Sequence, residues 1–193
     1  MPEQYRGRPL VHPDSRSAWR RWLRKHHADT DGVWLARWRK AEGRAPLDYD
    51  AIVEEALCFG WIDGLVNTLE DGRQAHLMTP RRKGSPWARS NKDRVERLIA
   101  EGRMTDAGAD AIRAAKADGT WSMQDAAEAL IEPLELAAAL DANPEARRRW
   151  DGFTPSQRRA LIWWVMSAKR PETKERRVAE IVAEAAQGRR ANA

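Results

Sequence analysis

The residues best suited to chemistry lie in one basic segment, residues 79–91, which reads TPRRKGSPWARSN. The candidate binding residues of the segment combine positive charge with a hydroxyl, an aromatic ring and an amide, and they are Arg81, Arg82, Lys83, Ser85, Trp87 and Asn91. A glycine-containing loop leads here into a predicted helix, and a helix N-terminus presents unpaired N–H groups and partial positive charge to an anion. The tryptophan ring can stack on a base or a sugar. The segment therefore predicts a site for a phosphorylated small molecule or for nucleic acid.

A simpler interpretation of the same segment stays open. The spacing G-x-x-x-x-G-K-[ST] of a P-loop is absent, so the pattern does not specify a nucleotide site. The alternative is a solvated basic turn in which Trp87 packs into the core and Ser90 or Asn91 caps the following helix.

The second candidate region is EALCFGWIDG, residues 55–64, which contains Trp61 and Asp63. Gly60 is predicted to end a helix in the left-handed conformation, so that Trp61 begins a strand. Asp71-Gly72 predicts a two-residue type I′ hairpin turn. This turn sets a strand register in which Asp63 lies opposite Pro80. We therefore expect Asp63 to pair with Arg81 or Arg82, either as a structural clamp or as a component of a site. If the protein is an enzyme, Asp63 is the candidate general acid or base.

The cysteine and the histidines argue against other chemistries. Cys58 is the only cysteine, which excludes an internal disulfide, and its default role is that of a small buried hydrophobic residue. In the predicted register His76 lies four residue pairs from Asp63, roughly 13 Å away, so no dyad is expected. The four histidines show no metal-ligand spacing. The sequence thus predicts neither a metal site nor a cofactor.

The periodicity of apolar residues predicts the elements that would position these groups. Helices are expected at residues 15–28 and 48–59, and a strand is expected at residues 33–40. Together with the hairpin, that strand predicts a small antiparallel sheet of about three strands. After Asn91 the pattern is helical throughout. We predict an α+β fold with a mainly helical C-terminal half.

The best boundary lies in the loop that begins at Trp121. It divides the chain into an α+β region, 1–120, and a helical region, 121–193, which can also pack as one compact domain.

Composition and charge limit the classes of protein to which this chain can belong. The chain has 193 residues and a formal net charge of +5. The longest strongly apolar run, 161–166, is far too short to span a bilayer, and residues 1–13 lack the apolar stretch of a secretory signal. We expect a cytoplasmic protein without membrane insertion. Residues 79–103 carry eight basic and three acidic side chains, whereas residues 104–146 carry two and nine. These blocks either neutralise each other or leave a basic patch.

Several stretches together resemble one bacterial family. They are GVWL, YDAIVEEALCFGWIDG, TPRRKGSPWARSNKDRVERLIAEGRMT, AAKADGTW, LDANPEAR and SQRRALIWWVMSAKRPETKERR, which occur in this order from about Trp19 to Arg177. The chain is similar in these motifs to the YdeI/OmpD-associated, or bacteriocin-protection, family. The resemblance implies a link to envelope stress or bacteriocin tolerance, but no reaction, cofactor or catalytic residue. The matching motif positions are Trp61, Asp63, Gly64, Arg81, Arg82, Gly84, Ser85, Trp87 and Asn91. Members often carry an aromatic residue before TPR, where this chain has Met78.

Three functions remain open at this point. The first is a non-enzymatic binder that grips an anion with the 79–91 segment. The second is an enzyme that uses Asp63 as acid or base while Arg81 and Arg82 hold an anionic substrate. The third is a protein-interaction module that docks a partner, which the sequence does not identify, through the C-terminal helices, including an exposed Trp163.

Overall fold

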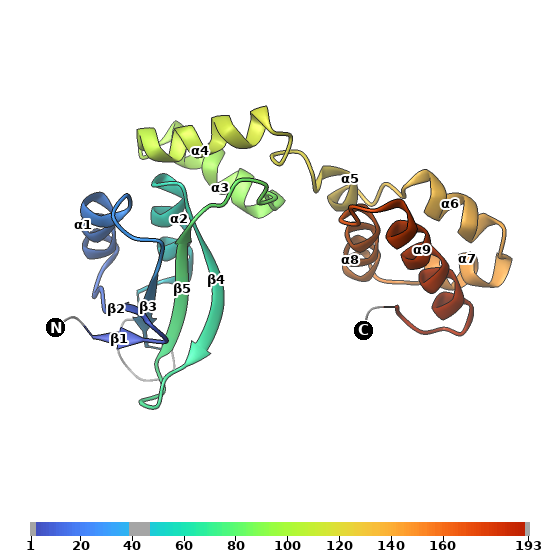
Figure 1. Cartoon of the computed structure of the whole chain (residues 1–193), viewed down its shortest axis with the longest axis horizontal. Coiled ribbons are helices and arrows are strands. Elements are labelled where there is room, and N and C mark those ends of the chain that lie inside the picture. Colours follow the sequence, from blue (N-terminus) through green and yellow to red (C-terminus); the bar gives the residue numbers. More distant parts are fainter. Residues whose placement is uncertain (1–2, 39–46, 192–193) are drawn as a thin grey trace. The chain divides into compact units, whose positions relative to one another are not determined.

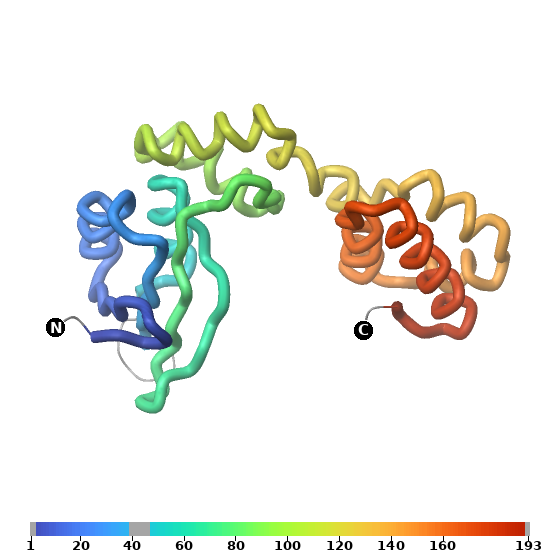
Figure 2. The backbone as a smooth tube through the Cα atoms, viewed as in Figure 1, coloured from blue at the N-terminus to red at the C-terminus, as the bar shows by residue number. Residues whose placement is uncertain are grey.

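The structure is a computed structural model that describes residues 3–38 and 47–191 (Figure 1). By its internal contacts the chain divides into two compact units, Met1–Ser122 and Met123–Ala193. Figure 2 follows the backbone through both units in chain order. Each unit has its own hydrophobic core and is described separately below.

The first unit is built on a mixed five-stranded sheet. Its strands are β1 (Gln4–Tyr5), β2 (Arg8–Val11), β3 (Val33–Arg37), β4 (Trp61–Thr68) and β5 (Gln74–Pro80). Their order across the sheet is β1-β2-β3-β5-β4, in which β2 and β3 run parallel and the other neighbours run antiparallel. The α+β class is confirmed, but the expectation of about three strands was too low. The two additional strands are only two and four residues long, too short to show an alternating pattern.

Four helices complete this unit: α1 (Arg16–His26), α2 (Tyr49–Cys58), α3 (Arg89–Ala100) and α4 (Asp106–Ala117). Strand β3 has the predicted alternation, because Val33 and Leu35 join the main core with α1 and α2 while Trp34 packs on the opposite face. The predicted strand 33–40 was too long: β3 ends at Arg37, and residues 39–40 lie outside the described part of the chain.

The hairpin of β4 and β5 differs from the predicted one in turn and register. Its loop has three residues between Leu69 and Arg73, and Gly72 takes φ +87°, an arrangement typical of three-residue hairpin loops with a bulge. A second irregularity follows between Asp63 and Val66. Each feature shifts the pairing by one residue, so Asp63 lies opposite Met78 and the predicted pairing with Pro80 was wrong.

The second unit is helical, as predicted for the C-terminal half. It contains α5 (Asp125–Glu128), α6 (Leu134–Asp141), α7 (Pro144–Asp151), α8 (Pro155–Met166) and α9 (Pro171–Ala186). Leu136, Trp150 and Ile162 are fully buried in its core. The predicted capping box is present, because Thr154 and Gln157 bond reciprocally at the start of α8. None of the helices in the described residues is long and apolar enough to cross a membrane.

Candidate functional site

Two glycines set the position of α4 relative to the end of the hairpin. Gly60 ends α2 with φ +73°, as predicted, and a Cβ there would lie 3.0 Å from the carbonyl oxygen of Ala107. A Cβ on Gly108 would collide with the carbonyl group of Cys58. Thr105, the predicted N-cap of α4, donates its hydroxyl to that same carbonyl at 2.5 Å. The C-terminal end of α2 and the first turn of α4 are therefore in close contact, which places α4 beside the end of β5 (Figure 1).

The loop after β5 and the second half of α4 enclose a cleft of about 540 Å³, which we call the α4 cleft. Its lining from the loop is Arg81, Arg82, Lys83, Gly84, Ser85 and Trp87. Its lining from α4 and the turn that follows is Ala111, Ala114, Ala115, Ala117, Asp118 and Thr120. Five residues of the predicted site thus meet in one hollow, whose floor is made of alanine side chains.

Arg82 and Lys83 are the cations that the cleft leaves available. Both are exposed, and neither forms an ion pair within 4 Å among residues 3–38 and 47–191. Ser85 is partly buried beside them and contributes a hydroxyl to the lining. A phosphate group offers three acceptor oxygens, and these three side chains are donors of the kind that bind it.

Arg81 has a different role from its two neighbours. It donates to the carbonyl oxygen of Pro86 at 2.7 Å, and its guanidinium carbon lies 3.8 Å from the centre of the Trp87 ring. Burial lowers the pKa of Arg81 to about 10, against the opposing influence of the Asp63 charge. At neutral pH Arg81 is therefore charged and fixes the shape of the loop.

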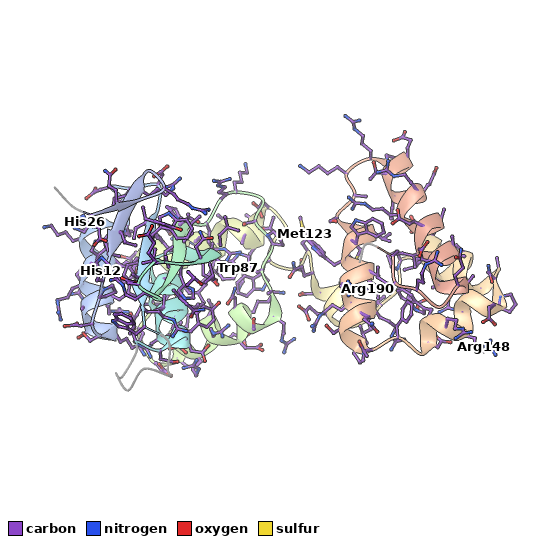
Figure 3. All side chains as sticks on the ribbon, turned by 90° about the horizontal axis from the view of Figure 1, so that it is seen from below. His12, His26, Trp87, Met123, Arg148 and Arg190 are labelled. Carbon is purple, nitrogen blue, oxygen red and sulfur yellow. The ribbon has the colours of Figure 1, made fainter. Side chains whose placement is uncertain are left out.

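Trp87 packs into the core, as the simpler interpretation of the segment predicted. It is 1% exposed, and its ring centre lies 5.0 Å from that of Trp121. The backbone N–H of Trp87 donates to the carbonyl oxygen of Thr120 at 3.4 Å, which ties the loop to the end of α4. Figure 3 labels Trp87 among the side chains of the first unit. The ring is a wall of the cleft and has no exposed face on which a base could stack.

Asn91 and the start of α3 do not lie where the sequence suggested. Helix α3 begins at Arg89 with Ala88 as its N-cap, so the predicted caps Ser90 and Asn91 were wrong. The side-chain oxygen of Asn91 accepts a hydrogen bond from Arg94 at 3.2 Å. Asn91 is not part of the cleft lining. The helix therefore begins earlier in the chain than the predicted caps implied, and Pro86 and Trp87 lie between the basic run and its first turn.

Trp61 and Asp63 lie outside the cleft as well. Trp61 is 1% exposed and donates its ring N–H to the carbonyl oxygen of His27, which identifies it as a core residue. Asp63 accepts a hydrogen bond of 2.5 Å from the hydroxyl of Tyr49. Burial and this carboxylate raise the pKa of Tyr49 to about 12. The expected ion pair with Arg81 is not formed within 4 Å, although the two charges influence each other.

The bulge in β4 brings Asp63 and His76 nearer than the predicted register allowed. Tyr49 contacts both, because its ring centre lies 5.5 Å from that of His76. Nε2 of His76 accepts from Nε of Arg37 at 3.2 Å, and Nδ1 has no partner among the described residues. Burial and the Arg37 charge lower the pKa of His76. His76 is therefore a neutral imidazole inside the first unit.

Sequence reasoning missed one group in the cleft lining, Asp118, which follows α4. Its carboxylate accepts from the Thr120 hydroxyl at 2.6 Å and from the Thr120 N–H at 3.0 Å. These bonds, with a further one from the Gly84 N–H, lower the pKa of Asp118. The motif ADGTW contains the signal that could have revealed it, since an Asp that follows a helix and precedes Gly commonly bonds backbone two residues onward.

A second feature missed from the sequence is a buried arginine–glutamate cluster on α2. Glu54 is 4% exposed and Glu55 is 0% exposed. Four arginines bind the two carboxylates: Arg16, Arg20, Arg97 and Arg103. The next turn holds Cys58, and burial raises the pKa of its thiol, so that Cys58 behaves as the expected inert core residue. The basic block 79–103 is thus partly neutralised inside the fold.

Comparisons with known proteins divide the chain in two. Residues 11–111 match the family model described as a domain of unknown function (DUF8412). Residues 129–188 match the model described as "Bacteriocin-protection, YdeI or OmpD-Associated". No curated protein and no solved structure matches the chain. The predicted resemblance is confirmed for the second unit, but motifs that carry the 79–91 segment fall within the other family model.

Proposed function

We propose a function from the site itself, because the chain belongs to the family of the domain of unknown function DUF8412 and carries a YdeI/OmpD-associated domain in its second unit, and neither family description names a ligand. The proposal is that the α4 cleft binds a small phosphorylated molecule. The observation that carries it is the pair Arg82 and Lys83, two neighbouring cations without an ion-pair partner in the described chain, at the mouth of a hollow of about 540 Å³.

The dimensions and lining of the cleft suit a metabolite. Pockets for small molecules have volumes of about 300–1,000 Å³, with a largely apolar lining and a few polar groups that fix orientation. Here the exposed Ala114 and Ala117 of α4 supply apolar surface, while Arg82, Lys83 and Ser85 supply donors. An organic phosphate would place its phosphate group on these donors and its carbon skeleton over the alanines.

The same features favour a small molecule over nucleic acid. Binding of single strands relies on exposed aromatic platforms and on a positively charged groove. Trp87 is buried, and the α4 side of the cleft carries the negative charge of Asp118. A polyanion crossing this cleft would meet that carboxylate, whereas a small phosphate ester can bind on the cationic side alone.

The enzyme and interaction-module hypotheses have less support. Asp63, the candidate acid or base, does not line the cleft and is bonded to Tyr49. Trp163 is half-buried beside a smaller hollow of about 200 Å³ between α5 and α8, and it does not form a broad apolar surface.

Binding can be tested by titrating the full chain with ethyl phosphate and following backbone amide shifts by NMR. We expect shifts concentrated at residues 82–85 and 114–118, and weaker binding as salt is raised. The double substitution Arg82→Ala and Lys83→Ala should weaken binding by about tenfold or more, because two charge-assisted contacts are removed.

A matched control removes the same amount of charge elsewhere. Arg89→Ala with Arg113→Ala deletes two exposed arginines that do not line the cleft and that pair with Asp93 and Asp110. This control should bind ethyl phosphate like the unaltered chain. Equal weakening in both double variants would reduce the effect to net charge and refute the site. Tighter binding of a single-stranded oligonucleotide than of ethyl phosphate would favour nucleic acid as the ligand.

We also propose a cytoplasmic location. The support is the single cysteine, Cys58, which is buried as a free thiol, the state that a reducing compartment maintains. Fractionation of bacteria that express the chain with a C-terminal epitope would test it, and recovery with the periplasmic contents would contradict it.

A further inference from the structure

The α4 cleft contains a fixed negative charge on its α4 side, close to Lys83. Asp118 is exposed in the lining, and hydrogen bonds from Thr120 and Gly84 lower the pKa of its carboxyl, which is ionised at neutral pH. Lys83 lies near enough for its charge to favour the ionised form of Asp118. A ligand that fills the cleft therefore meets donors on the loop side and a carboxylate on the α4 side.

The carboxylate keeps capacity for further hydrogen bonds. An ionised carboxylate offers about four lone-pair positions. Two hydrogen bonds to it come from the Thr120 hydroxyl and the Thr120 N–H, and the Gly84 N–H lies near enough to favour its ionised form. These donors are neutral, so the charge of Asp118 has no directly bonded counter-charge among the described residues.

The C-terminus of α4 adds partial negative charge on the same side of the cleft as Asp118. Helix α4 ends at Ala117, and its last turn forms this wall of the cleft. The C-terminus of a helix carries partial negative charge and favours a cation within the last turn. Asp118 and the helix terminus thus act in the same direction and on the same part of the ligand.

We infer that the ligand of the α4 cleft is zwitterionic: a phosphate ester that also carries an ammonium group, which binds Asp118 while the phosphate binds Arg82 and Lys83. This inference rests on the proposed function and specifies its ligand class. The chemistry is that of a phosphorylated amine. Asp118 is then the residue that determines specificity, because it rejects simple phosphate esters relative to those with a positive group at the other end.

Two commercially available probes differ only in the group at issue. O-Phosphoethanolamine carries a phosphate monoester and an ammonium group, and ethyl phosphate lacks the ammonium. For the full chain we expect O-phosphoethanolamine to bind about fivefold more tightly by calorimetry, the size of a solvent-accessible charge contact. The preference should shrink as salt is raised, because the ammonium–Asp118 attraction is screened.

The substitution Asp118→Asn removes the charge and keeps an acceptor oxygen for the Thr120 bonds. In this variant the preference should fall to about one, through weaker binding of O-phosphoethanolamine and unchanged or tighter binding of ethyl phosphate. If the variant is less stable, the salt dependence of the preference in the unaltered chain remains an independent test.

The outcomes separate the inference from the function on which it rests. Equal binding of both probes by the unaltered chain, or a preference that survives Asp118→Asn, overturns the zwitterion inference and leaves phosphate binding intact. Binding of neither probe, or binding that is insensitive to loss of Arg82 and Lys83, overturns the proposed function itself. Loss of the preference in Asp118→Asn, with ethyl phosphate still bound, supports both.

Discussion

The arginine–glutamate cluster and the α4 cleft both contain several cationic side chains of the first unit. The cations of the cluster are paired with carboxylates, whereas Arg82 and Lys83 of the cleft are not. In the cluster every arginine is bonded to Glu54 or Glu55, with N–O distances of 2.6 Å for Arg16 and Arg20. In the cleft, Arg82 and Lys83 have no ion-pair partner among residues 3–38 and 47–191. The difference lies in what faces the cation: a buried carboxylate in the first case and a hollow in the second.

This contrast shows why a run of basic residues in a sequence does not identify a binding surface. The block 79–103 contributes cations to both regions, because Arg97 and Arg103 bind the buried glutamates while Arg82 and Lys83 line the cleft. Cations bound to buried carboxylates stabilise the fold and have little left for a ligand. Cations without such partners keep their charge available to a ligand, and Arg82 and Lys83 present it in the lining of a cleft.

The largest expected effect is on the stability that the arginine–glutamate cluster provides. Glu55→Ala removes a fully buried carboxylate and leaves Arg16, Arg20 and Arg103 without it. Because the arginines are partly exposed and can be rehydrated, we expect the free energy of unfolding to fall by about 3 kcal/mol, at the lower end for a broken buried pair. Urea unfolding followed by tryptophan fluorescence measures it.

A control for this substitution uses the same arginines. Glu101 is exposed and lies 3.6 Å from both Arg97 and Arg103. Glu101→Ala should cost less than about 1 kcal/mol, as is usual for surface pairs. Equal losses for Glu55→Ala and Glu101→Ala would mean that burial does not distinguish the cluster from an ordinary surface network.

The second effect concerns the packing that holds the cleft open. Gly108→Ala forces a methyl group against the carbonyl of Cys58, and α4 must move away from the end of α2. We expect a loss of about 1–3 kcal/mol, typical of overpacking. Since α4 forms one wall of the cleft, ethyl phosphate binding should weaken too, which Glu101→Ala should not cause. Calorimetry and urea unfolding of both variants separate these effects, and unchanged binding in Gly108→Ala would show that the cleft tolerates a shift of α4.

The sequence predicted local secondary structure well, but it did not predict the arginine–glutamate cluster. The helix that Gly60 ends, the cap at Thr105 and the strand alternation at Val33 and Leu35 follow from local rules, and the structure has them. Helical periodicity did not single out Glu54 and Glu55, because the burial of these carboxylates depends on arginines from α1, from α3 and from the turn after α3. Such partners are set by tertiary packing, which one helix does not encode.

The candidate site was predictable in part for the same reason. The basic run 81–83 and Ser85 lie in the cleft, as their spacing suggested. Asp63 was misplaced, because the three-residue loop at Gly72 and the bulge after Asp63 each shift the strands by one position. An Asp-Gly pair is compatible with several turn types, so a one-residue error in the turn displaces every pairing beyond it.

The third effect is a dependence of stability on pH that belongs to the cluster. Burial alone would raise the pKa of Glu54, but hydrogen bonds from Arg97 and Arg16 outweigh it, and the pKa is lowered from 4.5. A carboxyl whose folded pKa is depressed contributes stability that is present above the unfolded value, near pH 4.5, and lost as the pH falls through the folded value. Glu54→Gln should therefore flatten the acid side of the stability curve below pH 4.5. Urea midpoints between pH 2.5 and pH 7 measure it. The control is Glu180→Gln, which removes an exposed carboxylate that has no ion-pair partner among the described residues. A Glu54→Gln curve parallel to that of the unaltered chain would contradict the assignment.

The smallest expected effect on stability is the one that bears most on function. Arg82→Ala with Lys83→Ala removes exposed cations that have no ion-pair partner in the described chain, so the free energy of unfolding should change by less than about 0.5 kcal/mol, or rise as repulsion with Arg81 is relieved. The same variant is expected to lose ethyl phosphate binding. A variant that loses binding without losing stability places the two cations in a site, as opposed to a structural network. If the double variant instead loses as much free energy of unfolding as Glu55→Ala, then Arg82 and Lys83 stabilise the fold as the cluster arginines do, and they are not the cations of a binding site.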